Sequence, residues 1–450
     1  MNLKEIQRVY FIGIGGIGMS ALARYFHHIG KRVAGYDKTR TPLTQELETL
    51  GMDIHYQDKL EDVPGVFKEV NGTLVVYTPA VPDSHSELYY FLNQGFAVKK
   101  RSEVLGLITK DTFAFAVAGT HGKTTTSCIL AHLLKEAKGS FTAFLGGISE
   151  DFNSNFVFEG DHYSVVEADE FDRSFLRLYP NVACITSMDA DHLDIYGTAS
   201  DLKDAFVAFA ERIATDGKLL VRQGLPLNGI TYGIEEAAAY NIMNIAIKDG
   251  SYVFDIKGPF GIIKDVVFNK PGRHNLLNAL AAFAMAVEAG FEPGLLAKGL
   301  QTFKGVQRRF SYQLKERDFV FIDDYAHHPT EINAVFDAVS EMHPHTFKMV
   351  VFQPHLFSRT KDFAEEFAQS LAKFDSVLLL DIYPAREEPI PGVTSNWLLD
   401  KIDHPRKKLV NKSEVIDEVS ITKPNLLITL GAGDIGLEVP KIKKALAYAS

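Results

Sequence analysis

Cysteine and tryptophan are scarce in this chain, whose 450 residues include two cysteines and one tryptophan. Two cysteines cannot build the disulfide framework that stabilises small secreted domains, which excludes that class and suits a reducing compartment. The first residues do not resemble a secretory signal. The early apolar stretch, residues 9–23, is too short to span a bilayer. We therefore expect a cytoplasmic protein that does not enter a membrane.

Positive charge is also in deficit. The chain has 47 Lys and Arg against 57 Asp and Glu, a net charge of −10. This balance argues against binding nucleic acid or an anionic membrane as the main function. No repeat of solenoid length and no low-complexity tract is visible. With 46% hydrophobic residues the chain can fill ordinary cores, and at roughly 150 residues per domain its length suggests about three domains.

Short apolar strands alternate with helical stretches along most of the chain. Three segments each open with such a strand, followed by a loop and a helix. They begin near residues 8, 113 and 319, and further strands are predicted at 348–352, 376–380 and 426–430. This alternation predicts an α/β protein with parallel sheets. We place the domain boundaries after residues 107 and 306.

The first glycine-rich loop reads Gly13-x-Gly15-x-x-Gly18, and Asp37 ends the next predicted strand. Glycines at this spacing allow a tight turn, and the helix that follows directs its N-terminus at a pyrophosphate. The loop therefore predicts a diphosphate site, although glycines alone do not identify which diphosphate. The same spacing recurs at residues 431–436. There a second site and a purely structural turn are equally consistent with the sequence.

A second candidate phosphate loop reads V-A-G-T-H-G-K-T-T-T-S over residues 117–127. It ends like a P-loop, with Gly122, Lys123 and Thr124. The usual early glycine is missing, because Val117 stands five positions before Gly122 and the nearest upstream glycine is Gly119. A strand before the loop and a helix after it still favour a phosphate site. Lys123 would neutralise phosphate charge, and the Thr124 hydroxyl would bind Mg²⁺.

Carboxylates follow two predicted strands downstream of this loop, where sites of α/β proteins usually lie. The first group is Glu167, Asp169 and Glu170, and the second is Asp189, Asp191, His192 and Asp194. Magnesium prefers such hard oxygen ligands. Solvated surface acids are the alternative explanation, but two groups after a Gly-Lys-Thr loop favour a metal–ATP site.

Several motifs, in a fixed order, resemble the Mur ligases of peptidoglycan synthesis. They are G-T-H-G-K-T-T-T, E-A-D-E, D-H-L-D, H-N-L-L-N-A-L-A-A and D-D-Y-A-H-H-P. The phosphate loop of that family has the same shortened form. The resemblance implies a Rossmann-like UDP-sugar-binding domain (1–107), a central P-loop-ATPase-like domain with a parallel sheet (108–306) and a Rossmann-like C-terminal domain that closes over the amino acid (307–450).

The first glycine loop, with Q-P-H-x-x-S-R and G-A-G-D-I-G, resembles the branch of the family that adds L-alanine to UDP-N-acetylmuramate. This implies ATP-dependent amide-bond formation through an acyl phosphate, with ATP and two Mg²⁺ ions. A monomer or weak homodimer acting on small molecules is expected. Alternatives are the ligase that adds a murein tripeptide to the same nucleotide, a folylpolyglutamate-synthetase-like ligase, and a nucleotide-gated binding module without ligase chemistry.

The resemblance also implies roles for individual residues. Those expected to bind ATP are Gly119, Thr120, His121, Gly122, Lys123, Thr124, Thr125, His274, Asn275, Arg309 and Asp324. The metal ligands would be Thr124, Glu167 and His192. UDP-sugar contacts would come from Gly15, Gly16, Gly18, Ser20 and Asp37. The catalytic group would comprise Lys123, His327, His355 and Arg359, with Tyr325 binding substrate.

The chain departs from the family pattern at three places. Leu356 stands where many relatives have an arginine, and Gln57-Asp58 replaces a glycine-histidine pair near the uridine. Phe206 occupies the position of a carbamylated lysine in sister ligases. Because the alanine-adding members also lack that lysine, this last departure supports the narrower branch.

Overall fold

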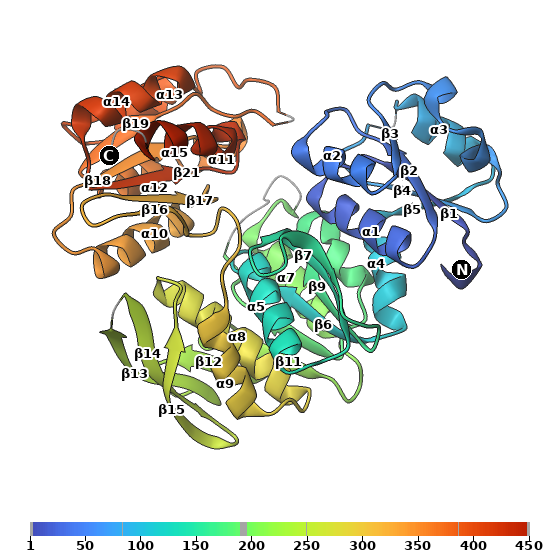
Figure 1. Cartoon of the computed structure of the whole chain (residues 1–450), viewed down its shortest axis with the longest axis horizontal. Coiled ribbons are helices and arrows are strands. Elements are labelled where there is room, and N and C mark those ends of the chain that lie inside the picture. The colour runs from blue at the N-terminus through green and yellow to red at the C-terminus, as the bar shows by residue number, and fades with distance from the viewer. Residues whose placement is uncertain (1–2, 83, 190–195, 249, 386, 448–450) are drawn as a thin grey trace. The chain divides into compact units, whose positions relative to one another are not determined.

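The computed structural model describes residues 3–82, 84–189, 196–248, 250–385 and 387–447. Their strands form three sheets (Figure 1). The chain divides into two compact units, which we describe separately. Unit 1 comprises residues 1–246, 253–268 and 277–304, and unit 2 comprises residues 247–252, 269–276 and 305–450.

The N-terminal sheet of unit 1 has five parallel strands in the order β3-β2-β1-β4-β5. They are β1 (Arg8–Ile12), β2 (Arg32–Tyr36), β3 (Asp53–His55), β4 (Thr73–Tyr77) and β5 (Ala97–Lys100). The helices are α1 (Ile17–His28), α2 (Pro42–Thr49), α3 (Ser86–Asn93) and α4 (Arg101–Lys110), with 3-10 turns η1 (Leu3–Glu5), η2 (Leu60–Asp62) and η3 (Gly65–Lys68). The central strand β1 is almost wholly apolar because neighbouring strands and helices bury it.

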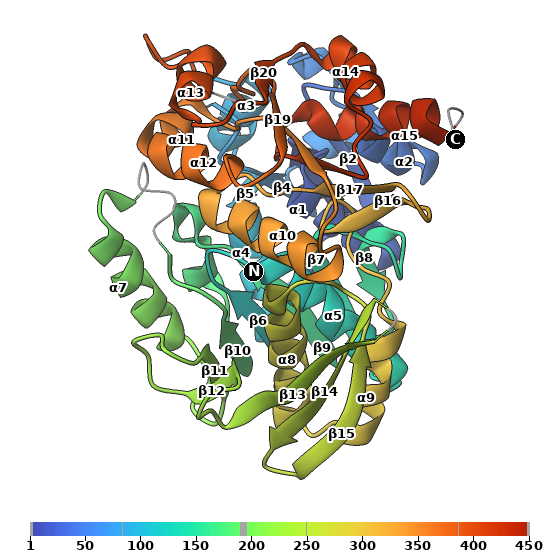
Figure 2. The ribbon, with the colours of Figure 1, turned by 90° about the vertical axis from the view of Figure 1, so that its left-hand side faces the viewer.

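The central sheet has ten strands in the order β15-β14-β13-β12-β11-β10-β6-β9-β7-β8. They are β6 (Phe113–Ala118), β7 (Phe141–Ser149), β8 (Ser154–Phe158), β9 (Tyr163–Ala168), β10 (Val182–Ile185), β11 (Lys218–Arg222), β12 (Ile230–Ile234), β13 (Tyr240–Lys248), β14 (Ser251–Gly258) and β15 (Gly261–Phe268). The helices are α5 (Lys123–Glu136), η4 (Phe171–Arg177), α7 (Ala199–Ala210), α8 (Arg273–Glu288) and α9 (Pro293–Thr302). Strand β8 pairs antiparallel with β7, and α9 packs on β15 (Figure 2).

The sheet of unit 2 has six strands in the order β16-β17-β21-β18-β19-β20. They are β16 (Ser311–Lys315), β17 (Val320–Asp324), β18 (Lys348–Phe352), β19 (Ser376–Leu379), β20 (Lys407–Leu409) and β21 (Leu426–Leu430). The helices are α10 (Pro329–Met342), α11 (Phe357–Asp362), α12 (Ala364–Leu371), α13 (Ser395–Lys401), η5 (Lys412–Glu414), α14 (Val415–Thr422), η6 (Asp434–Leu437) and α15 (Val439–Ala447).

The α/β class with mainly parallel sheets is confirmed, and each of the six strands predicted from the apolar runs is present. The antiparallel edge strands β8 and β16 were not predicted. The boundaries after residues 107 and 306 stay a prediction, and residue 107 lies within α4. Across the described ranges we find no helix with the length and hydropathy that a bilayer crossing requires.

Phe206, at the position of the lysine of sister ligases, is part of an aromatic cluster in unit 1. It lies on α7 and contacts Phe175 edge-on, with ring centroids 5.5 Å apart. Phe209, one turn later, stacks on the same Phe175 ring at 5.0 Å. All three side chains are fully buried. The aromatic side chain is therefore part of the core, and an ammonium group there would lie among apolar rings.

Replacing Phe206 tests this packing. Phe206→Ala should lower the free energy of unfolding by about 3–5 kcal/mol because it leaves a cavity. Phe206→Lys should cost at least as much, because it buries a charge. Urea denaturation followed by circular dichroism measures both, and Val207→Ala, at an exposed position of the same helix, should change stability by less than about 0.5 kcal/mol. A Phe206→Lys protein as stable as the wild type would contradict this account.

Candidate functional site

Two glycines with left-handed backbone shape the loop between β6 and α5. Gly119 has φ 130° and Gly122 has φ 87°, values that other residues adopt only with strain. A Cβ on Gly119 would come within 2.1 Å of the Thr186 hydroxyl, and one on Gly122 within 2.5 Å of the Asn278 side-chain oxygen. Both space and conformation therefore require glycine at these positions.

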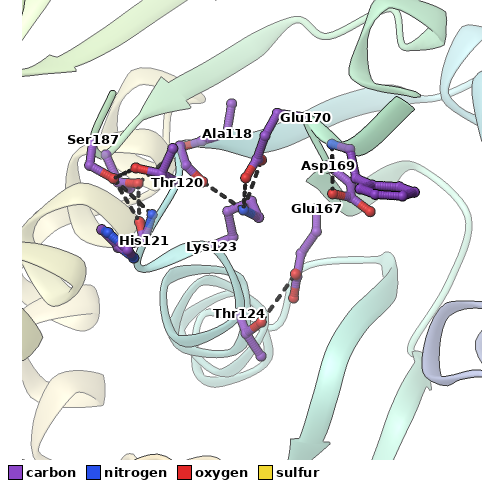
Figure 3. Close-up of polar contacts among 12 residues, drawn as sticks. Ala118, Thr120, His121, Lys123, Thr124, Glu167, Asp169, Glu170 and Ser187 are labelled. Atoms are coloured by element: carbon purple, nitrogen blue, oxygen red, sulfur yellow. Dashed lines mark hydrogen bonds and ion pairs between the residues drawn. The ribbon is translucent and has the colours of Figure 1, made fainter. Parts of the chain in front are cut away.

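Residues after β10 hold this loop from the side (Figure 3). The Ser187 hydroxyl lies 2.9 Å from the Thr120 hydroxyl and accepts a hydrogen bond of 2.8 Å from the His121 backbone N–H. The Thr186 hydroxyl donates to the His121 carbonyl at 2.5 Å. The sequence analysis did not single out Thr186 and Ser187, although hydroxyls directly after a buried strand were a visible signal. Their bonds fix the loop without a ligand.

Lys123, the first residue of α5, lies against a buried carboxylate. Its ammonium donates to both carboxylate oxygens of Glu170 at 2.8 Å and to the Gly119 carbonyl at 2.7 Å (Figure 3). Burial by itself would lower the pKa of Lys123, but the charges of Glu170 and Asp169 outweigh it and raise that pKa. The lysine therefore stays charged at the start of the helix. The N-cap Gly122 has no side chain to cap α5, so the helix N-terminus is suited to phosphate.

Thr124 and Glu167 come together although 43 residues separate them. The Thr124 hydroxyl donates to Glu167 at 3.1 Å, and the other Glu167 oxygen accepts a hydrogen bond of 2.6 Å from the Gly146 N–H. Burial raises the pKa of Glu167. Two adjacent hard oxygens fit the donor preference of Mg²⁺, whose remaining ligands can be waters and substrate phosphates.

The third predicted ligand, His192, lies outside the described residues, as do Asp191 and Asp194. Within the ranges that the structure describes, no group of three or more His, Cys, Asp or Glu side chains could hold a metal by itself. The hydroxyl–carboxylate pair of Thr124 and Glu167 is thus the described part of the predicted metal site.

Asp37 anchors the first glycine loop. One of its carboxylate oxygens accepts a hydrogen bond of 2.7 Å from the Gly15 N–H, and a Cβ on Gly15 would lie 2.8 Å from the same oxygen. Ser20 is buried in α1, where its hydroxyl donates to the Ile17 carbonyl and accepts from Asn155 on β8 at 2.8 Å. Asp37 and Ser20 therefore support the loop, and the N-cap of α1, Gly16, has no side-chain cap.

Among the predicted nucleotide contacts that lie in unit 2, Asp324 and Asn275 are buried. Asp324 accepts hydrogen bonds from the backbone N–H groups of Phe310 at 2.6 Å and Ala326 at 2.7 Å. Burial nevertheless raises the pKa of Asp324 to about 6. Burial also lowers the pKa of His274 to about 4, so its imidazole is neutral near pH 7. The Asn275 amide donates to the Pro271 carbonyl at 2.6 Å.

The residues predicted to line the reacting centre form a second cluster in unit 2. The rings of His327 and His355 have centroids 5.9 Å apart, and the Arg359 guanidinium lies 3.4 Å from the His355 Nδ1. The Nδ1 of His327 is 3.0 Å from the Tyr325 carbonyl. The Arg309 guanidinium lies over the Tyr325 ring, 4.9 Å from its centroid. Tyr325, His327, His355 and Arg359 were predicted together as lining the reacting centre, and Arg309 was predicted to bind ATP. The structure places all five close together, and their roles stay predictions.

The second glycine loop, residues 431–436, packs closely on its surroundings. A Cβ on Gly433 would lie 2.4 Å from the Gln353 side-chain oxygen, and one on Gly436 would lie 2.6 Å from the Arg308 guanidinium. Arg308 in turn donates to the Gly431 carbonyl at 2.5 Å and to Asp323 at 3.2 Å. These close contacts explain why glycines are needed here even if no ligand binds. Of the two interpretations of this loop, they favour the purely structural turn.

Three family models match the chain in sequence order. They are described as the catalytic domain of the Mur ligase family (residues 8–112), the Mur ligase middle domain (117–286) and the glutamate ligase domain of Mur ligases (308–435). The UDP-N-acetylmuramate–L-alanine ligase of Flavobacterium johnsoniae is 56% identical over 99% of both chains. The ligase of the same name from Porphyromonas gingivalis is 48% identical over 98% of this chain and 99% of its own.

The chain belongs to the Mur ligase family. Solved structures agree with this assignment. The UDP-N-acetylmuramate–alanine ligase of Thermotoga maritima superposes with a TM-score of 0.84 at 27% identity, covering 98% of this chain and 100% of that one. A murein peptide ligase of Psychrobacter arcticus shares the fold, with a TM-score of 0.69 at 22% identity and 98% coverage of both chains. The three-domain Mur ligase fold predicted from the motifs is thereby confirmed.

The raised pKa of Asp324 predicts a pH effect on this Mur ligase. With a folded pKa of about 6 against an ordinary value of 3.8, the folded protein binds a proton that the unfolded chain does not bind between these values. This stabilisation is present at low pH and is lost as the pH rises through about 6. Between pH 7 and pH 5, the free energy of unfolding of the wild type should rise by about 1 kcal/mol relative to Asp324→Asn. Urea denaturation at both pH values checks this, and equal changes in the two proteins would contradict it.

Proposed function

We propose that this Mur ligase joins L-alanine to UDP-N-acetylmuramate, using ATP and releasing ADP and phosphate, as a step in making peptidoglycan precursors. The observation that carries the proposal is the 56% identity, over 99% of both chains, to a curated ligase of that name. The chemistry of the phosphate loop also supports it, because Lys123 and Thr124 start α5 beside Glu167 of β9.

The phosphate loop supports ATP binding through residues 119–125. Lys123 and the uncapped N-terminus of α5 would attract the phosphates. Thr124 and Glu167, with His192, would hold Mg²⁺, and two such ions would neutralise the charge on the transferred phosphoryl group. His274, Asn275, Arg309 and Asp324 would contact the nucleoside side of ATP and its phosphates. Because His274 is neutral near pH 7, it would act by hydrogen bonding and not by charge.

The reaction must first activate a carboxylate, because that anion has no good leaving group. Transfer of the γ-phosphoryl group from ATP to the muramyl carboxylate gives an acyl phosphate and ADP. The amine of L-alanine attacks the acyl carbon, the C–O bond to phosphate breaks, and an amide and inorganic phosphate form. The chain supplies charge and position: Lys123 and an arginine stabilise the phosphoryl oxygens.

The amine of alanine must lose a proton before or during its attack. His327 and His355 are the candidate acceptors, since their rings lie near each other and near Arg359. The Nδ1 of His327 is 3.2 Å from Glu331 as well as near the Tyr325 carbonyl. A hydrogen on Nδ1 would be held there, which leaves Nε2 to accept the proton. Tyr325 would bind substrate beside this pair.

The sugar nucleotide would bind over the first glycine loop, where Gly15, Gly16 and Gly18 allow its diphosphate close to the start of α1. Asp37 and Ser20, both hydrogen-bonded within the loop region, would keep that shape. We further propose a cytoplasmic enzyme, monomeric or weakly dimeric, with domain boundaries after residues 107 and 306.

Phosphate release from ATP tests the proposal directly. With UDP-N-acetylmuramate present, we expect release to depend on L-alanine, with L-serine, glycine and the murein tripeptide assayed in parallel. Glycine and serine differ from alanine by one small group, which a pocket discriminates by about 1–3 kcal/mol. Release that requires the tripeptide would favour the tripeptide-adding ligase instead. Absence of release with every acceptor would overturn ligase function.

Lys123→Ala should lower kcat at least about a hundredfold, because it removes the charge that faces the transferred phosphoryl group. Binding of UDP-N-acetylmuramate, measured by calorimetry, should survive and shows that the variant is folded. Lys135→Ala, which removes an exposed lysine from the last turn of the same helix, is the matched control and should keep wild-type turnover. Wild-type kcat in Lys123→Ala would refute the assigned role.

A further inference from the structure

Arg101, the first residue of α4, lies directly on the first turn of α1 in unit 1. A Cβ on Gly18 would come within 2.9 Å of Nη1 and 3.3 Å of Cζ of this arginine. The helices α1 and α4 pack against each other. The guanidinium therefore sits at the same end of α1 as the loop glycines. Its charge adds to the positive end of the helix dipole at this point.

The same guanidinium reaches the acidic strand end. Its Nη2 donates to the Asp169 carboxylate at 3.3 Å, and the other Asp169 oxygen accepts a hydrogen bond of 3.1 Å from the Phe171 N–H. The Arg101 side chain is 22% exposed and that of Asp169 37% exposed. Ion pairs this accessible to water are weak, so an incoming anion can replace the carboxylate at low cost.

A small surface pocket lies beside this ion pair. Arg101, Glu167 and Asp169 line it together with apolar side chains, among them Leu105 and Phe175. Arg101 thus contacts the first glycine loop and faces a pocket shared with the carboxylate that pairs with Thr124. Among the described residues named for the proposed reaction, Arg101 alone has both positions.

The neighbouring Lys100 provides a contrast. Its ammonium donates to Asp172 at 2.8 Å, and this hydrogen bond raises the pKa of Lys100. Lys100 is not among the residues that line the pocket. Lys100 and Arg101 are therefore adjacent cations at the start of α4 that face different groups. Lys100 can serve as the matched control for Arg101.

We propose that Arg101 is a substrate-binding residue that exchanges Asp169 for the diphosphate of the sugar nucleotide. This rests on the function proposed above, since it requires a diphosphate at the N-terminus of α1. A diphosphate carries more negative charge than one carboxylate and offers several oxygens to a planar guanidinium. The exchange frees Asp169 next to Glu167. Occupation of the first glycine loop thereby changes the charge that faces the phosphate loop.

Calorimetric titration of the full chain with UDP, without ATP or Mg²⁺, tests the exchange. Arg101→Ala should raise the Kd for UDP about tenfold or more, because a charge-assisted contact is lost. Arg101→Lys should fall between this variant and the wild type, since the ammonium keeps the charge without the planar fork. Lys100→Ala should bind UDP within about twofold of the wild type. Asp169→Asn should bind UDP at least as tightly as the wild type, since it releases the arginine beforehand.

Each result that differs from these expectations has a separate interpretation. Arg101→Ala with wild-type affinity for UDP would overturn the inference and leave the proposed ligase function intact. Asp169→Asn with a tenfold weaker affinity would contradict the exchange. Titration with ADP and Mg²⁺ at the phosphate loop controls for folding, and an equal loss of ADP and UDP affinity in Arg101→Ala would show general damage and overturn the inference. A wild-type protein without affinity for UDP would overturn both the inference and the proposed function.

Discussion

The buried ion pair between Lys123 and Glu170 is the contact on which the phosphate loop depends. A lysine at the start of a helix and inside a protein is unfavourable unless an opposite charge compensates it. Glu170 supplies that charge through both of its oxygens. The loop therefore holds a charged ammonium at the start of α5. In the proposed function, phosphate oxygens of a nucleotide would compete with Glu170 for it. The ion pair itself holds the ammonium in place without a nucleotide.

The strand order of the central sheet brings Glu170 to Lys123. Strand β6, which leads into the loop, lies between β9 and β10. Ala118 at the end of β6 is in register with Ala168 on one side and Ile185 on the other. The polar residues that follow each neighbour, Glu170 after β9 and Ser187 after β10, therefore reach the loop from opposite sides. Parallel strands gather their carboxyl ends at one edge, which explains why three distant segments build one site.

Unit 2 buries ionisable groups close to the residues for which we propose a role in the reaction. Asp324 accepts two backbone N–H groups and still has a raised pKa, and His274 is held neutral. In both residues, burial disfavours the charged form of the side chain. In the cluster of His327, His355 and Arg359, the Nδ1 of His327 lies 3.0 Å from the Tyr325 carbonyl, and the Arg359 guanidinium lies 3.4 Å from the His355 Nδ1.

Much of this protein could be predicted from its sequence because the signals are local. Apolar runs define the strands, glycines define the two turns that need them, and Gly122-Lys123-Thr124 defines the phosphate loop within a few residues. The ordered motifs also identified the family. Pairings between distant segments could not be predicted in this way. Glu170 binds Lys123, and Glu167 accepts a hydrogen bond from Thr124. These pairings, and the contact of Arg101 with Gly18, depend on strand register and helix packing across tens of residues. No local pattern encodes such a register, so only the tertiary structure decided which carboxylate meets which cation.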